Sequence, residues 1–186
     1  MEERYQEEFT SESKNPISKG VYEDCSFKQV DLATQDLSEY KFINCEFIEC
    51  NLSNCKLLES SFQECHFSKS KLLGLQFEDC KDFNFGVYFK NSQLNHATFF
   101  QMNLTNCSFD NCELQEVDFA EADMSSIALK NCNLLNANFD RTNLERADFS
   151  GSINIALDPE INQIKGAKFP SDQLIGLLAK YGIEVV

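Results

Sequence analysis

The chain has 186 residues, with 16 Lys and Arg against 30 Asp and Glu, and its net charge at pH 7 is −14. This length suits one domain, and an acidic surface argues against direct binding to nucleic acid. No apolar run is long enough to span a membrane, and the N-terminus lacks the basic flank and apolar core of a signal peptide, so we expect a cytoplasmic protein without a membrane segment.

The first segment, residues 1–20, is polar and contains Pro16 and Gly20. We expect a loosely ordered lead-in. Tyr5, Phe9 and Ile17 are its apolar side chains, and they are candidates for an N-terminal cap on whatever structure follows.

A period of five residues begins near Tyr22. The centres of the first run are Phe27, Leu32, Leu37, Phe42, Phe47, Leu52, Leu57, Phe62, Phe67, Leu72 and Phe77. On an α-helix, five residues advance roughly 500°, which would scatter these side chains over every face. In an extended segment, residues i−2 and i point to the same side. Each repeat is therefore one short side of a coil, and stacked coils bury the inward pairs in a continuous core.

All nine cysteines occupy position i−2 of this repeat, which is the inward slot for small residues. They are Cys25, Cys45, Cys50, Cys55, Cys65, Cys80, Cys107, Cys112 and Cys132. Free cysteine behaves as a small buried hydrophobe, so we expect reduced thiols that serve the core. His66 and His96 fall at outward positions, and the sequence predicts no metal site and no cofactor.

The repeat breaks at residues 81–90. The next expected centre is Asp82, which is unsuited to an apolar core, and the period resumes two residues late at Phe89. We expect Phe83 or Phe85 to replace Asp82 through a bulge, with Gly86 supplying an unusual backbone conformation. The break is either a contact point for a partner, formed by Phe83, Phe85, Gly86 and Tyr88, or an insertion absorbed at a corner.

The second run extends from Phe89 to Phe149 and contains an acidic stretch. Between Asn91 and Leu129 there is no Lys or Arg, and the acids are Asp110, Glu113, Glu116, Asp118, Glu121 and Asp123. Nearly two coils span roughly 10 Å, over which duplex DNA carries about six negative charges. These six side chains are therefore candidates for a DNA-like field that faces a partner.

The pattern decays after Gly151, and a different element follows. The segment PSDQLIGLLAKYGIEVV predicts an α-helix that Ser171 or a neighbour caps, with Gly182 at its end and a short strand at 183–186. Its apolar stripe is Leu174, Ile175, Leu177, Leu178 and Tyr181. The stripe is expected to cover the last coil and to pair with a second copy of the chain.

Segments such as ADMSS, NANFD and RADFS resemble the A(D/N)LXX unit of the pentapeptide repeat proteins. The resemblance covers residues 21–155 and implies an all-β solenoid, a right-handed quadrilateral β-helix with four repeats per coil and about six coils. Residues 1–20 would then form the N-terminal cap, and residues 156–186 a C-terminal capping and dimerisation module.

The overall plan is similar to that of the Qnr-type quinolone resistance proteins and the microcin immunity protein. That resemblance implies a homodimeric DNA mimic that binds DNA gyrase or topoisomerase IV and protects it from antibiotics or toxins. The alternative is an acidic interaction scaffold or effector for a non-topoisomerase partner. The sequence contains no nucleophile motif and no glycine-rich phosphate loop, so we expect no enzymatic activity.

Overall fold

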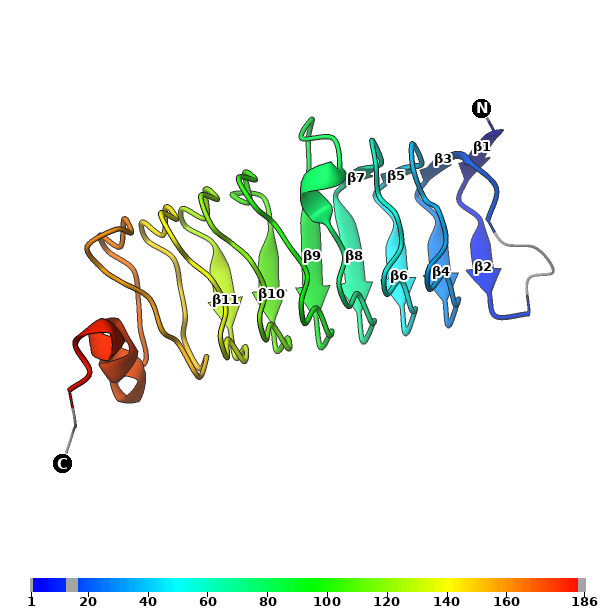
Figure 1. Ribbon diagram of the computed structural model, residues 1–186. Helices are drawn as coiled ribbons and strands as arrows, with labels where there is room; N and C mark the ends of the chain where they lie inside the picture. Colours follow the sequence, from blue (N-terminus) through cyan, green and yellow to red (C-terminus); the bar gives the residue numbers. More distant parts are fainter. Residues whose placement is uncertain (1, 13–16, 184–186) are drawn as a thin grey trace.

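The computed structural model describes residues 2–12 and 17–183. The chain winds into a narrow rod, with the N-terminal coil at one end and the C-terminal helix at the other (Figure 1). The strands are β1 (Glu2–Tyr5), β2 (Glu8–Thr10), β3 (Gly20–Glu23), β4 (Ser26–Lys28), β5 (Lys41–Ile43), β6 (Glu46–Ile48), β7 (Ser61–Gln63), β8 (Cys65–Ser68), β9 (Val87–Lys90), β10 (Ser108–Asp110) and β11 (Ala128–Lys130). Two 3₁₀-helices complete the elements, η1 (Phe77–Asp79) and η2 (Ser171–Tyr181).

The strands form two parallel sheets that run along the rod. Their orders are β1-β3-β5-β7 and β11-β10-β9-β8-β6-β4-β2. Most partners lie twenty residues apart, as Phe42 pairs with Phe62 and Phe109 with Leu129. One coil therefore contains four five-residue segments, which confirms the predicted β-helix of pentapeptide repeats.

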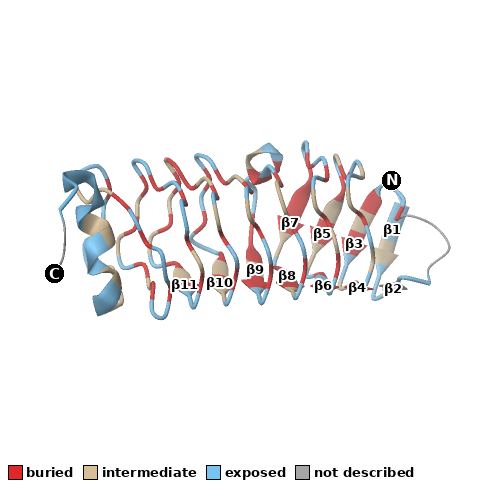
Figure 2. Cartoon of the chain, turned by 60° about the horizontal axis from the view of Figure 1, so that its bottom comes forward, coloured by how far each residue is buried: buried red, intermediate tan, exposed pale blue. Residues whose placement is uncertain are grey.

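The core is a stack of side chains from positions i−2 and i, and buried residues recur along every coil (Figure 2). Phenylalanine rings stack from coil to coil, with centroids 4.7 Å apart for Phe27 and Phe47 and 4.6 Å apart for Phe47 and Phe67. Each buried Phe stabilises the fold by up to about 3 kcal/mol. All nine cysteines are buried and free, which is the state predicted for position i−2.

The turns explain the polar positions of the repeat. Residue i+2 adopts the left-handed conformation in most repeats; Asn44, for example, has φ 50°, and its amide donates to Gln63 O of the next coil at 2.8 Å. An Asp or Asn at i−1 accepts a hydrogen bond from the amide of i+1, as Asp36 does from Ser38 at 3.0 Å. Such Asx bonds fix the turn. The Asp or Asn of the motif therefore stabilises the turn.

The N-terminal segment is more ordered than the sequence suggested. β1 pairs with β3 and β2 with β4, both with an 18-residue register, so residues 2–12 contribute to an additional coil. The ring of Phe9 stacks on Phe27 at 4.9 Å and Ile17 is buried, whereas Tyr5 is 60% exposed and covers little. The expectation of a loosely ordered lead-in was wrong because Phe9 extends the phenylalanine column by one ring.

The break at 81–90 inserts two residues, since Phe67 pairs with Phe89 twenty-two positions later. Phe85 occupies the inward position, while Asp82 is exposed and Phe83 is 73% exposed on a loop that projects beyond the other corners (Figure 1). The unusual backbone belongs to Asn84, with φ 55°, and Gly86 is not among the residues with positive φ. The expectation for Gly86 was therefore wrong.

The repeats continue beyond Gly151. Asp148 forms a bridge to Lys168, and the rings of Phe149 and Phe169 stack at 4.9 Å. The solenoid thus extends to Phe169, past the boundary expected at residue 155. The sequence did not predict this last coil because residues 152–162 depart from the five-residue pattern.

The helix η2 lies across the C-terminal end of the rod (Figure 1), but it is a 3₁₀-helix instead of the expected α-helix. With three residues per turn, Gln173, Gly176 and Ala179 align in one row. This row includes the contact with the last coil, because a Cβ at Gly176 would lie 1.6 Å from Ile155 O. Ile183 is not in a strand, and the rest of the expected strand, 184–186, lies outside the described residues.

Candidate partner-binding surface

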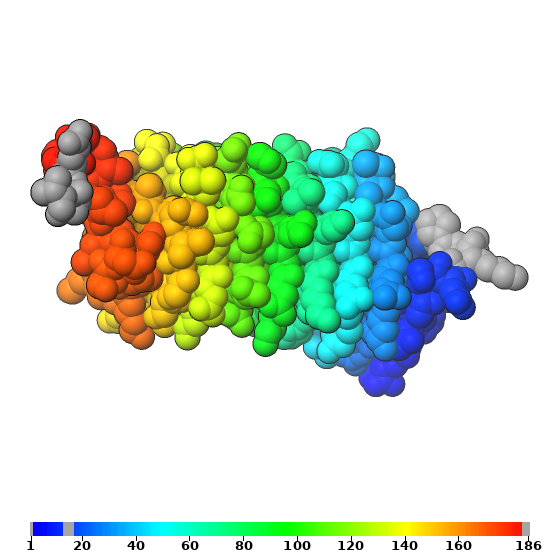
Figure 3. All heavy atoms as spheres, turned by 90° about the horizontal axis from the view of Figure 1, so that it is seen from below, coloured from blue at the N-terminus to red at the C-terminus, as the bar shows by residue number. Residues whose placement is uncertain are grey.

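The four segments of each coil give the rod four faces, numbered here in chain order. Face 1 contains β3, β5 and β7, and face 2 contains the seven-stranded sheet. Face 3 follows the bridges Asp31–Asn51–Lys71–Gln93–Glu113–Asn133, and face 4 includes the bridges Asp36–Lys56 and Gln76–Thr98–Asp118–Asn138. Figure 3 shows successive coils as neighbouring bands of the rod.

The six acids predicted from the sequence do not come together on one face. Asp123 lies on face 1, Asp110 on face 2, Glu113 and Glu116 on face 3, and Asp118 and Glu121 on face 4. Consecutive repeats turn around the coil, so a run of acids in the sequence encircles the rod instead of following its axis. The predicted cluster is therefore a ring of about one coil.

Several of these carboxylates also serve the fold. Asp118 Oδ1 accepts the Ala120 amide at 2.9 Å and the Asn138 amide group at 3.0 Å. Asp123 Oδ1 accepts the Ser125 amide at 3.0 Å. Asparagine fills the same role elsewhere, for example at Asn103, so the charge can be removed without losing the turn.

Negative charge gathers on face 4, which we call the acidic face. From residue 36 to residue 141 it carries the acids Asp36, Glu39, Glu59, Glu78, Asp79, Asp118, Glu121 and Asp140, against Lys56 and Arg141. Eight acids against two bases leave −6 over six coils, or about one net charge per 4.8 Å strand spacing. Face 2, on the opposite side of the four-sided coil, is nearly neutral, because Glu46, Glu49 and Asp110 oppose Lys28, Lys69, Lys90 and Lys130.

The pKa values of two carboxylates on the acidic face are lowered by their neighbours. A hydrogen bond from Gln101 at 2.7 Å, together with Arg141, lowers the pKa of Glu121. Hydrogen bonds from Ser38 lower the pKa of Asp36. Asp36 is exposed, so its charge is available to a partner, whereas Glu39 forms an exposed ion pair with Lys19 at 3.0 Å.

Sequence reasoning missed six members of this face, namely Asp36, Glu39, Glu59, Glu78, Asp79 and Asp140. The available signal was the twenty-residue spacing of Glu39, Glu59 and Asp79, which places them in one column. A count of acids along a window of sequence cannot detect such a column, since the window follows the coil instead of the axis.

The predicted loop contacts separate into three places. Phe83 projects at the corner after η1, beside the acidic face, where Lys81 forms an ion pair with Glu59 at 3.6 Å. Phe85 is in the core, while Tyr88 belongs to β9 on face 2. Only Phe83 of the predicted set is thus placed to meet a partner of the acidic face.

The predicted dimer contacts gather on η2. Leu174, Ile175, Leu178 and Tyr181 are between 40% and 57% exposed, and Leu177 packs partly against the core. The helix is tied to the rod by ion pairs of Lys180 with Asp158 and Glu160 at 2.8 and 2.6 Å, and by a hydrogen bond from Tyr181 Oη to Glu160 at 2.8 Å. An apolar row therefore faces outward at this end of the rod.

Other features add no chemistry to this surface. Within residues 2–12 and 17–183 no group of three or more His, Cys, Asp or Glu side chains is arranged to hold a metal ion. No helix in the same described part is long and apolar enough to cross a membrane.

Comparisons with known proteins agree with this architecture. No curated protein sequence matches the chain. Two structures of trypsin-treated QnrB1, a plasmid-mediated fluoroquinolone resistance protein, are similar at 20% and 21% identity, each with a TM-score of 0.50. They cover 100% and 98% of this chain, and 100% and 99% of the QnrB1 chains.

A pentapeptide repeat protein of the cyanobacterium Nostoc, HetL, aligns at 17% identity over 88% of this chain and 84% of its own, with a TM-score of 0.29. At 20% and 21% identity the likeness to QnrB1 establishes the fold alone. The sequence profile of the pentapeptide repeat region matches residues 22–99 and 102–169. The chain belongs to the pentapeptide repeat family.

Proposed function

We propose that this protein is a DNA mimic that binds DNA gyrase or topoisomerase IV in the cytoplasm and protects the enzyme from an antibiotic or toxin. The acidic face is the observation that carries the proposal. On this face a net charge of −2 recurs on every second coil, so the rigid rod presents a negative field, which a basic DNA-binding groove attracts.

Two further features support the same role. Phe83 projects beside the acidic face, and an exposed aromatic side chain is a typical anchor at an interface. The outward row Ile175, Leu178 and Tyr181 fits a homodimer joined at the C-terminal ends, which would double the length of the acidic face. QnrB1, whose structure resembles this chain, is described as a fluoroquinolone resistance protein.

The test compares two variants of equal net charge. The first carries Asp36→Asn, Glu39→Gln, Asp118→Asn, Glu121→Gln and Asp140→Asn on the acidic face. The control carries Asp31→Asn, Glu46→Gln, Asp110→Asn, Glu113→Gln and Glu116→Gln on faces 2 and 3. Asparagine keeps the turn bond that Asp36 and Asp118 make, so both variants are expected to fold.

Binding to purified gyrase and topoisomerase IV is measured at two salt concentrations, together with supercoiling in the presence of a fluoroquinolone. Exposed ion pairs contribute roughly 0.3–1 kcal/mol each, so the first variant should bind at least about tenfold more weakly. The control should bind nearly as tightly as the unmodified protein. An equal loss of affinity in both variants would show that the acidic face is not the binding interface.

The scaffold reading has one observation in its favour, because Leu58 and Phe100 are 58% and 38% exposed on the acidic face itself. Neither side chain adds to the negative field, whereas a partner that binds without reading charge would bury both. If neither topoisomerase binds and no poison is countered, the acidic face serves such a partner. Replacing Leu58 and Phe100 with Ser would then abolish that interaction.

A further inference from the structure

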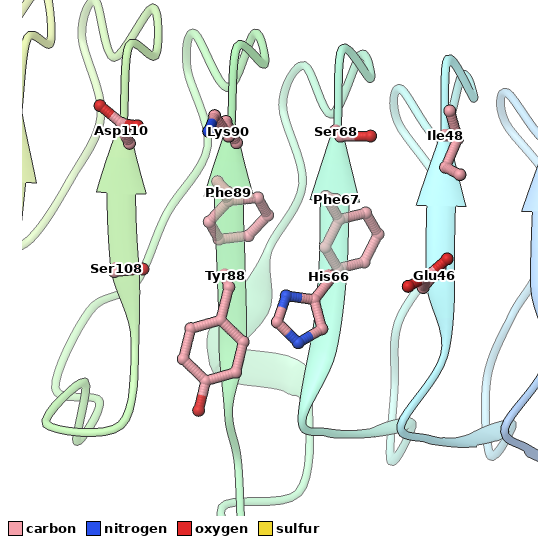
Figure 4. A pocket seen from close by; sticks show the side chains of 10 residues that line it. All are labelled: Glu46, Ile48, His66, Phe67, Ser68, Tyr88, Phe89, Lys90, Ser108 and Asp110. Carbon is pink, nitrogen blue, oxygen red and sulfur yellow. The ribbon is translucent and has the colours of Figure 1, made fainter.

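A second surface lies on face 2, at the middle of the seven-stranded sheet. His66 on β8 and Tyr88 on β9 are register partners, and their rings pack with centroids 4.7 Å apart and planes 22° apart. They line a pocket of about 450 Å³, and both point toward the start of their strands (Figure 4). In the same row Glu46 and Ser108 lie on the two adjoining strands.

The orientation of Tyr88 is held by a carboxylate. Its hydroxyl donates a hydrogen bond to Glu64 Oε2 at 2.9 Å. Glu64 reaches this position over Gly86, where an added Cβ would lie 3.4 Å from Glu64 Oε1. Burial, followed by this bond, raises the pKa of Tyr88 to about 12. The phenol therefore remains a donor, and donation to a carboxylate makes its ring more electron-rich.

The carboxylate of Glu46, next to the two rings, does not stabilise the fold through a side-chain contact. Glu46 is exposed and is the register partner of His66, and its carboxylate makes no hydrogen bond or ion pair within residues 2–12 and 17–183. A cross-strand aromatic pair alone is explained by sheet stability. An unpaired carboxylate beside two ring faces is, in addition, the arrangement that binds a planar cation.

We propose that this pocket binds the guanidinium group of an arginine side chain presented by a partner protein. The guanidinium lies flat on the His66 and Tyr88 rings and donates hydrogen bonds to Glu46. Lys90, the cation of the pocket, projects from the opposite end of β9, away from the rings (Figure 4). Face 2 is opposite the acidic face, so this contact does not depend on the proposed function.

The probe is N-acetyl-arginine methylamide, titrated into the full chain while NMR follows the ring resonances of His66 and Tyr88. We expect shifts confined to this pocket, and smaller ones with the lysine counterpart. Exposed cation–π contacts correspond to roughly a two- to fivefold change in affinity, so Tyr88→Ala and Glu46→Gln should each weaken binding by about that factor. Tyr88→Phe should retain most of it, and Tyr181→Ala, at the far end of the rod, should change nothing.

Three results would overturn the proposal. Equal chemical-shift changes with the arginine and lysine probes would mean that the pocket responds to positive charge alone. A stronger response to N-acetyl-phenylalanine methylamide would identify an aromatic ligand instead. No ring shift with any probe would leave the two rings as a sheet-stabilising pair.

Discussion

The glycine at position 176 controls how closely η2 approaches the end of the solenoid. A Cβ at this position would lie 1.6 Å from Ile155 O and 2.7 Å from Ile155 C. Gly176 does not have a positive φ, so alanine is compatible with its backbone and the whole effect is steric. The carbonyl of Ile155 belongs to the backbone of the last coil and cannot rotate away, so Gly176→Ala must move the helix.

The size of the effect follows from what the helix loses by moving. Overpacking costs about 1–3 kcal/mol. The contacts that hold η2 are the partial burial of Leu177, a 3.4 Å hydrogen bond from Leu157 N to Gly176 O, and the exposed ion pairs of Lys180. Partial burial contributes about 1 kcal/mol and each exposed pair less than that. The steric cost is therefore comparable with the docking energy, and the helix should detach locally while the rod stays folded.

Hydrogen exchange measured by mass spectrometry tests this reasoning. Peptides covering 155–162 and 171–181 should exchange faster in Gly176→Ala, whereas peptides of β4 to β11 should be unchanged. Gly86→Ala is the matched control, because a Cβ there meets atoms no closer than 3.4 Å. Unchanged exchange at the C-terminal end of the Gly176→Ala variant would refute the close approach of η2.

Three further outcomes are expected. Phe109→Ala should destabilise the fold by about 3–5 kcal/mol in urea denaturation, because the ring is fully buried between neighbouring coils, and Phe83→Ala should have little effect. Burial raises the pKa of Cys65 and of Cys107, so these two buried thiols should react with a thiol reagent at neutral pH only after denaturation. The Ser150 hydroxyl, with Lys168 and Lys130, lowers the pKa of Asp148 to about 2. Its contribution to stability is therefore present above about pH 4 and is lost as the pH falls toward 2, so Asp148→Asn should flatten the stability profile in that range.

The sequence predicts the core residues because the same five-residue pattern repeats along the chain. The period of five excludes a helix and assigns inward positions, and the structure buries Phe27, Leu32 and Cys45 as that rule requires. The same periodicity placed the break at residues 81–90 and gave the length of the insertion as two residues, which the pairing of Phe67 with Phe89 confirms. Local spacing therefore predicts the β-helix, whose contacts recur at a constant offset in sequence.

The five-residue period does not predict features that depend on how the chain turns from one repeat to the next. Whether Phe83 or Phe85 enters the core is decided by the turn at Asn84, and both residues are equally apolar. The position of the acidic face depends on which repeats share a side of the coil, and the two-residue insertion shifts this register for every later acid. The row of Gln173, Gly176 and Ala179 on η2 forms because a 3₁₀-helix has three residues per turn, whereas the predicted apolar stripe assumed an α-helix.

The turn positions of the acidic face carry a conformational cost. At position i+2 the other faces include Asn44, Asn54 and Asn131 beside Glu49, Glu64 and Glu116, and asparagine tolerates the left-handed conformation better than glutamate does. No i+2 residue of the acidic face from 39 to 141 is Asn or Gly, and Glu39 and Glu121 adopt φ of 63° and 59°. Replacing these two glutamates with Asn should relieve strain of up to about 1 kcal/mol each and raise the melting temperature. If the acidic face binds a partner, the same changes should weaken that interaction, and this opposition between stability and binding is typical of a functional surface.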